Sequence, residues 1–205
     1  CHFHSSLFQS GNKLFTSLFF SFPSYISYKE GFSMRFLFHT TFKKDKHSIL
    51  AVILLGSLSH FLYELSGGAA IFALFCPINE SVWEHLKLLF FPFLFITVIQ
   101  WYRQKPPLLS FFYHRFLGIL CGLLTTVVLF YTYTGVIGRH FLIIDLLIFA
   151  FSVTVSFCTS RYFSRKCTVV PSQSIVFSLW IITALFFFVF SCCPPNIPLF
   201  FPPQA

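Results

Sequence analysis

Long apolar stretches alternate with short polar connections along most of this chain. Five of the stretches are long enough to cross the hydrocarbon core of a bilayer as helices, which takes roughly 17–25 residues. They fall at about residues 48–66, 80–102, 111–133, 141–159 and 174–193. The pattern therefore predicts an all-α fold, an integral membrane helical bundle of about five transmembrane helices.

A shorter apolar piece, residues 69–76, lies between the first two stretches and is ended by Pro77. It is too short to cross a bilayer. Backbone at membrane depth has to be buried by protein or to line water, because lipid offers no hydrogen-bond partners. We therefore expect a short re-entrant or interfacial segment here.

The amino-acid composition agrees with a protein that has lipid as its solvent. Of the 205 residues, 56% are hydrophobic and only 10% are charged, whereas soluble domains carry about a quarter charged residues. The seven cysteines show neither metal-type spacing nor the framework of a secreted disulfide domain. A lipid bilayer is therefore the expected partner of the chain.

The basic residues lie in clusters between alternate apolar stretches. The net charge of +8 comes with no basic stripe or nucleic-acid motif, so we predict no nucleic-acid binding. Lysines and arginines precede the first stretch and fill the second-to-third and fourth-to-fifth connections, whereas Arg139 stands alone on the other side. The positive-inside rule then predicts a multi-pass protein of the cell membrane with a cytoplasmic N-terminus and an extracytoplasmic C-terminus.

Residues 1–33 differ from the rest of the chain, being rich in Ser, Phe and Tyr without a clear period or a signal-peptide cleavage site. The only methionine is Met34. We therefore expect residues 1–33 to be a non-native or disordered upstream extension, with translation starting at Met34. Residues 34–205 are then a single transmembrane helical domain.

The most polar segment inside the apolar region is residues 77–87, Pro-Ile-Asn-Glu-Ser-Val-Trp-Glu-His-Leu-Lys. Glu80, Glu84, His85 and Lys87 stand within about two helical turns at the start of the second stretch. An ionisable group at the centre of a membrane helix costs roughly 2.5–3.5 kcal/mol on insertion scales. Such a cluster therefore needs partners or a functional role.

Two residues in this segment are suitable helix caps. Asn79 is a good N-cap, and the spacing from Ser81 to Glu84 fits a capping box, so either residue starts the helix. A helical wheel places three charged groups within about 60° of one another, with two more polar groups beside them. These groups are Glu80, Glu84 and Lys87, then Ser81 and His85.

Other spans carry polar groups that we expect at the same depth. Ser57, His60 and Glu64 share one helix face by their i, i+3, i+7 spacing, and Asp145 lies about one and a half turns inside the fourth stretch. With the predicted topology, four of the six acidic residues gather from three spans in the outer half of the bilayer. We expect a polar cavity that opens outward, roofed by residues 69–76, with the C-terminal tail as a second candidate cover.

A purely structural role fits the same residues. Glu84 can pair with Lys87 at i+3, and His60 can form a hydrogen bond with Glu64. Trp83 has the position of an interfacial anchor. Polar side chains that hold transmembrane helices together would then account for the cluster.

Several segments resemble the signature of an uncharacterised bacterial membrane-protein family, domain of unknown function 6512. The resemblance is carried by residues 56–67 (GSLSHFLYELSG) and 74–92 (LFCPINESVWEHLKLLFFP), and by later segments at 130–135, 141–145 and 194–200. It covers about residues 34–201, gives no counterpart for residues 1–33, and implies a tail that is shorter than in other members. It implies a polytopic protein of a bacterial cell membrane and supplies no activity.

The sequence thus supports an integral membrane protein of unknown activity with a polar, outward-facing intramembrane site. The first alternative is a membrane-embedded, metal-dependent hydrolase of a lipid-like substrate, with a divalent metal such as zinc. Zinc in such enzymes takes about three protein ligands and keeps one position open. The catalytic candidates are His60, Glu64, Glu84, His85 and Asp145, the first four are also the metal candidates, and Ser57, Asn79, Glu80, Ser81 and Lys87 complete the polar set.

The second alternative is a small proton-coupled transporter in which Glu84, His85 and Lys87 form a titrating relay. The third is a non-catalytic accessory protein whose polar cluster holds the helices together. The absence of a visible inverted repeat ranks the transporter below the hydrolase.

Overall fold

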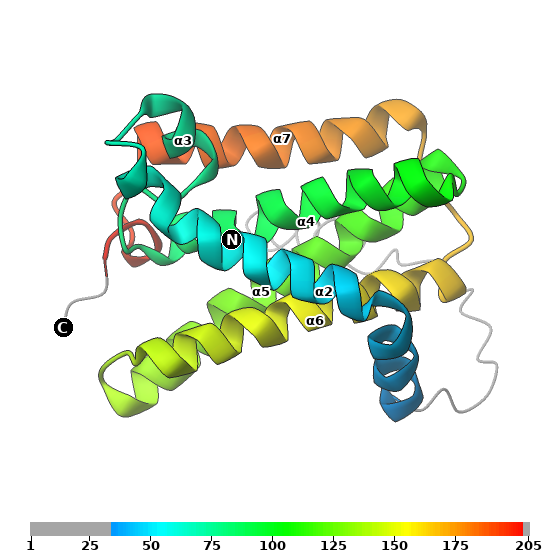
Figure 1. The fold of residues 1–205 in the computed structure, drawn as a ribbon, viewed down its shortest axis with the longest axis horizontal. Helices are drawn as coiled ribbons and strands as arrows, with labels where there is room; N and C mark the ends of the chain where they lie inside the picture. Colours follow the sequence, from blue (N-terminus) through cyan, green and yellow to red (C-terminus); the bar gives the residue numbers. More distant parts are fainter. Residues whose placement is uncertain (1–33, 203–205) are drawn as a thin grey trace, which may run out of the picture. The chain divides into compact units, whose positions relative to one another are not determined.

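Antiparallel helices form the part of the chain that the computed structural model describes, residues 34–202 (Figure 1). In chain order the helices are α2 (Met34–Leu65), α3 (Ala70–Phe75), α4 (Val82–Gln104), α5 (Leu108–Ile137), α6 (Leu142–Lys166), α7 (Gln173–Cys192) and the 3-10 turn η1 (Pro198–Phe200). The predictions made for residues 1–33 lie outside the described residues. The all-α prediction is confirmed.

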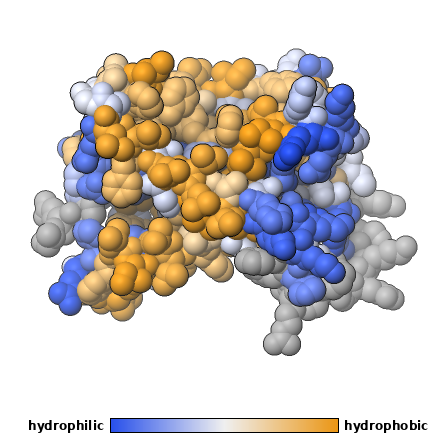
Figure 2. Space-filling model, viewed as in Figure 1, coloured by the Kyte–Doolittle hydropathy of each residue, from blue (hydrophilic) through white to orange (hydrophobic). Residues whose placement is uncertain are grey.

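Five of these helices are long and apolar enough to cross a membrane. They are Lys43–Leu65 within α2, and the whole of α4, α5, α6 and α7. Large hydrophobic side chains such as Leu58, Val128 and Ile181 are more than half exposed. On the face shown in Figure 2, hydrophobic residues gather in a broad central band and hydrophilic ones at the two ends. Such an outer surface is that of a multi-pass membrane protein.

Helix α4 is the central element of the bundle. Its span is 61% buried, whereas the spans of the other four helices are 17–28% buried. It packs against α2, α3, α5, α6, α7 and η1. Phe90 and Phe93 of α4 are fully buried, and the Phe90 ring lies 5.1 Å from that of Phe187 in α7. The charged residues Glu84 and Lys87 in the buried part of α4 therefore have protein rather than lipid around them.

The ends of the bundle are set by local backbone chemistry. Helix α4 begins at Val82 because Ser81 caps it, its side chain accepting a hydrogen bond from the Glu84 N–H at 3.3 Å. Gly67 and Gly68, with φ of 70° and 79°, turn the chain out of α2 in a conformation that other residues rarely adopt.

Helices α5 and α6 approach each other closely through small residues. Gly118 and Gly122 of α5 face Ser152 and Ser156 of α6. A Cβ atom on Gly122 would overlap the Ser156 Oγ and lie 3.0 Å from the Ser152 carbonyl oxygen. The Gly-x-x-x-Gly spacing allows this contact, which replaces the hydrophobic driving force that is absent between helices in lipid.

We expect Gly122→Ala to lower the stability of the protein by about 1–3 kcal/mol, because the added methyl group has to push α6 away from α5. The matched control is Gly135→Ala in the same helix, where a Cβ would meet no atom within 4 Å. Thermal unfolding in detergent measures the difference. Equal stability of the two variants would contradict the close packing.

Candidate functional site

The two ends of the bundle carry different polar groups. We call the end where α2 and α7 finish and α4 begins the site end, and the opposite end, where α4 and α6 finish, the basic end. Hydrogen bonds between α2 and α4 at Ser48 and Gln100, and between α4 and α7 at Glu84 and Ser191, fix this antiparallel arrangement.

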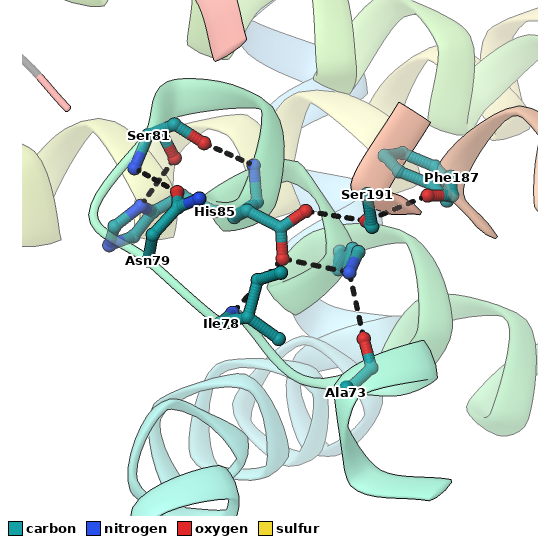
Figure 3. Close-up of polar contacts among 9 residues, drawn as sticks. Ala73, Ile78, Asn79, Ser81, His85, Phe187 and Ser191 are labelled. Atoms are coloured by element: carbon teal, nitrogen blue, oxygen red, sulfur yellow. Dashed lines mark hydrogen bonds and ion pairs between the residues drawn. The ribbon is translucent and has the colours of Figure 1, made fainter. Parts of the chain in front are cut away.

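Glu84 is the centre of a buried network at the site end (Figure 3). Its Oε2 accepts hydrogen bonds from the Lys87 ammonium at 2.8 Å and from the Ile78 N–H at 3.0 Å. Its Oε1 accepts a hydrogen bond from the Ser191 hydroxyl of α7 at 2.5 Å. The side chains of Glu84 and Lys87 are 2% and 0% exposed. The carboxylate is thus fully paired and inaccessible to a ligand.

Lys87 ties the short helix α3 to this network. Its Nζ also donates to the Ala73 carbonyl at 2.9 Å, so the piece predicted as re-entrant or interfacial covers the start of α4 (Figure 3). Cys76 follows α3 and is buried beneath it. Burial raises the pKa of the Cys76 thiol, which the nearby Lys87 charge offsets only in part. This cysteine therefore stays a neutral thiol.

The C-terminal tail covers the same helix from another side. Trp83 packs against Phe187 of α7 at 4.8 Å and against Phe200 of η1 at 4.9 Å between ring centroids. The tail thus contributes to the cover over α4, and Trp83 lies in an aromatic cluster with Phe187 and Phe200.

A second group of polar side chains, His60, Glu80 and His85, lies outside the buried network. The His85 Nε2 is 3.4 Å from one carboxylate oxygen of Glu80, and the His60 Nε2 is 4.0 Å from the other. The two imidazole rings are 5.3 Å apart between centroids. The Glu80 side chain is 70% exposed, so the group opens to the outside of the protein.

Helix α4 holds the ring of His85 in one orientation. The His85 Nδ1 is 2.8 Å from the Ser81 carbonyl oxygen, as Figure 3 shows. A carbonyl only accepts hydrogen bonds, so Nδ1 carries a proton and Nε2 is the nitrogen directed toward Glu80. This is the arrangement that a metal-binding histidine usually has.

The ring of His60 is held by packing alone. It contacts the ring of Phe61 at 5.1 Å between centroids and that of His85. Its Nδ1 is buried and finds no hydrogen-bond partner among the described residues. Within those residues, the expected hydrogen bond from His60 to Glu64 does not form.

Together these three side chains offer a metal-ligand set. One ligand atom from each of His60, Glu80 and His85 lies within 4.8 Å of the other two. Two imidazoles and one carboxylate suit zinc and similar divalent ions. Because Glu80 is exposed, a fourth position stays accessible to water or a substrate.

The structure divides the predicted site residues into two groups. Glu84 and Lys87 pair with each other, as the structural interpretation predicted. Glu80 does not share their face, because it precedes the first residue of α4 and the helical wheel does not apply to it. Glu80 therefore joins His60 and His85, the position that the sequence analysis expected Glu64 or Glu84 to fill.

Four other candidates lie outside the metal-ligand set. Glu64 is exposed near the end of α2, and Ser57 is half-buried in the same helix. Asn79 accepts a hydrogen bond from the Ser81 N–H at 2.9 Å, so both residues organise the start of α4.

Asp145 does not come together with the other candidates. It accepts a hydrogen bond from the Tyr133 hydroxyl, and its other oxygen is 3.3 Å from the His140 Nδ1. All three residues belong to the α5–α6 hairpin, whose tip lies apart from α3 in Figure 1. The expected gathering of four acids therefore does not include Asp145.

The sequence analysis missed two sets of residues. Ser191 is an unremarkable serine in an apolar helix, and only the fold places it on Glu84. Asp45, Arg115 and Arg161 form an ionic cluster at the basic end, where the sequence analysis considered only orientation. An arginine eight residues inside an apolar helix was the signal, because such a charge needs a partner.

Comparison with known proteins gives one result. The model of a family described as "Family of unknown function (DUF6512)" matches residues 16–203. No curated protein and no solved structure matches the chain. The matched region begins upstream of Met34, so residues 16–33 have a counterpart in the family, contrary to the expectation from the resemblance.

The buried network gives a testable prediction. We expect Lys87→Met to cost about 3–5 kcal/mol of stability, because it leaves the Glu84 carboxylate buried without its counter-charge. The double variant Glu84→Gln/Lys87→Met removes both charges and is expected to recover part of that loss. Thermal or denaturant unfolding in detergent measures both values.

Together with the single variant Glu84→Gln, these two variants complete a double-mutant cycle, which gives the interaction energy between Glu84 and Lys87. A coupling energy near zero between the two positions would show that the pair is not formed. Lys105→Met is the matched control, since Lys105 is exposed at the other end of the same helix.

Proposed function

The chain belongs to DUF6512, a family of unknown function, and we propose that it is a membrane-embedded hydrolase that depends on a divalent metal ion such as zinc. His60, Glu80 and His85 hold the ion in this proposal. The observation that carries it is the mutual proximity, within 4.8 Å, of three ligand atoms of the types that zinc prefers.

The distances suit a metal ion. With bonds of roughly 2.0–2.1 Å, the ligand atoms of a tetrahedral zinc site lie about 3.3 Å apart. One Glu80 oxygen is 3.4 Å from the His85 Nε2, close to this value, and the other Glu80 oxygen is 4.0 Å from the His60 Nε2. One ligand atom of each residue lies within 4.8 Å of the other two, and Glu80 stands in an exposed connection before α4. Small movements of the Glu80 and histidine side chains would bring all three ligands into range.

The open side of the group favours hydrolysis as the reaction. A metal ion with three protein ligands supplies a bound water that ionises near neutral pH. The hydrogen bond from His85 to the Ser81 carbonyl keeps Nε2 available as a ligand. The buried pair of Glu84 and Lys87 has a supporting role, because it holds the first turn of α4 under α3.

The surroundings support a lipid-like substrate. The group lies where α2 ends and α4 begins, near the end of two helices that are long and apolar enough to span a membrane. Ester and phosphoester bonds of lipids lie at this level of a bilayer. The polar site would thus meet such bonds without removing the substrate from the membrane.

We further propose that the site end faces the extracytoplasmic side of a bacterial cell membrane. Among the described basic residues, only Lys87 and Arg139 lie at the site end, and Lys87 is fully buried. The positive-inside rule then puts the N-terminus in the cytoplasm and the C-terminus outside. In this proposal residues 34–205 act as one transmembrane domain.

The proton-coupled transporter has less support. Glu84 and Lys87 neutralise each other inside the protein, and neither side chain reaches water. Of the three groups of the expected relay, only His85 remains partly exposed.

The metal site predicts the zinc content of the protein. Purified protein incubated with zinc and freed of excess metal is expected to retain one ion per chain, measured by mass spectrometry of the metal. Loss of one of three ligands, as in His85→Ala or Glu80→Ala, is expected to weaken zinc binding by more than the roughly 10–100-fold that loss of an outer-shell partner costs.

Glu64→Ala is the matched control, since Glu64 is an exposed acid on the helix that carries His60. The zinc-loaded protein is expected to hydrolyse a fluorogenic fatty-acyl ester, and His85→Ala is expected to abolish this activity. Equal loss of zinc in the Glu64 and His85 variants would contradict the site. Zinc binding without hydrolysis of any lipid ester would contradict the enzyme.

The native cysteines test the proposed orientation. Cys192 and Cys193 are exposed at the site end, and Cys167 lies at the basic end. A membrane-impermeant maleimide added to intact cells is expected to label a variant that retains only Cys192 and Cys193. A variant that retains only Cys167 is expected to react after permeabilisation alone, and the reverse pattern would overturn the orientation.

A further inference from the structure

A cavity of about 270 Å³ lies at the basic end, between the end of α4 and the facing parts of α2, α5 and α6. Its lining includes the side chains of Asp45, Arg115 and Arg161, with Ser110 and His114 beside them. It is separate from the proposed metal site, which lies at the other end of α4. Its charged lining residues are therefore free to bind a ligand other than the metal ion.

Arg115 is held rigidly in the wall of this cavity. Its side chain is 8% exposed. The guanidinium carbon lies 4.7 Å from the ring centre of Phe157 and 5.2 Å from that of Phe111. One guanidinium nitrogen donates to the Gln100 side-chain oxygen at 2.5 Å. Such a group is already oriented for a ligand, so binding costs little side-chain entropy.

The charges around the cavity do not balance. Asp45 is hydrogen-bonded by Arg161, and its other oxygen is 3.9 Å from Arg115. Among the described residues, one carboxylate thus faces two guanidinium groups, which leaves one positive charge. The other described acids, which lie toward the site end, are Glu64, Glu80, Glu84 and Asp145.

Arg161 also has unused hydrogen-bonding capacity. Its Nε is buried and has no partner among residues 34–202. A buried N–H of a cation without a hydrogen-bond partner is unfavourable, because its desolvation is not compensated by the protein. An anion with several acceptor oxygens would neutralise the surplus charge and accept hydrogen bonds from the accessible part of the Arg161 guanidinium, whose side chain is 19% exposed.

We propose that this cavity binds a phosphate group through Arg115 and Arg161, with Asp45 keeping the two guanidinium groups in position. Guanidinium groups match the tetrahedral oxygens of phosphate and form paired hydrogen bonds with them. In the proposed orientation the cavity lies at the cytoplasmic surface of the membrane, where the group comes from an anionic lipid headgroup or from a soluble phosphate compound.

The experiment uses the full chain and two probes. Binding of inorganic phosphate is measured by calorimetric titration of the chain in a non-ionic detergent. Binding of phosphatidylglycerol is measured with the chain in phosphatidylcholine nanodiscs that contain or lack that lipid. Binding of free phosphate identifies a soluble source, whereas binding of phosphatidylglycerol alone identifies a lipid headgroup. Absence of binding in both arms overturns the proposal.

Arg161→Gln is expected to weaken binding of whichever probe binds, inorganic phosphate or phosphatidylglycerol, by about tenfold or more, because it removes a charged donor from the site. Arg103→Gln is the matched control, an arginine in the last turn of α4 that does not line the cavity. The control is expected to stay within about twofold of the unmodified chain, as a screened surface charge should. Equal weakening in both variants would show that the phosphate group is attracted by the positive charge of the whole surface, and it would overturn the proposed binding site.

Arg161→Lys covers the case in which the glutamine variant does not fold. Lysine keeps the charge opposite Asp45 but lacks the planar fork of donors. It is expected to retain the thermal stability of the unmodified chain without ligand and to bind the probe several-fold more weakly. Binding equal to that of the unmodified chain would assign the ionic cluster a purely structural role.

Discussion

The buried ion pair between Glu84 and Lys87 is the interaction on which the site end depends. Burying a carboxylate and an ammonium costs several kcal/mol per ion, and their mutual attraction offsets this only with further hydrogen bonds. Here those bonds come from the Ile78 N–H, the Ser191 hydroxyl and the Ala73 carbonyl. One ion pair thus joins α4 to α3 and α7. Through the Ile78 N–H, the pair also helps to fix the connection before α4.

This connection explains why one short polar segment has two roles. Residues whose side chains turn inward, Glu84 and Lys87, satisfy one another. Glu80 precedes the helix and His85 turns to another face, so both remain outside the network and meet His60 of α2. The buried pair stabilises the fold, and the exposed group provides the chemistry that we propose.

The bundle separates two kinds of polar chemistry along its length. Imidazoles and an exposed carboxylate, which suit a divalent cation, lie at the site end. Guanidinium groups, which suit a phosphate group, lie at the basic end. Helix α4 connects the two ends and is the most buried of the spans.

The sequence by itself determined the helical class, the five apolar stretches and the local contacts along one helix. The capping of α4 by Ser81 and the pairing of Glu84 with Lys87 were predictable, because residues three apart on a helix are neighbours whatever surrounds them. Of the metal candidates that the sequence offered, the structure brings His60 and His85 together, and it adds Glu80 to them in place of Glu64 or Glu84.

Only the tertiary structure decided which residues meet across helices. Ser191 reaches Glu84 over 107 residues of sequence, and Arg161 reaches Asp45 over 116. Helical periodicity gives the face on which a side chain lies, but not the neighbour that this face meets. That neighbour depends on connections and on close approaches such as Gly122 against Ser156. Glu80 lies outside any helix, so only the packed connection could direct it to the histidines.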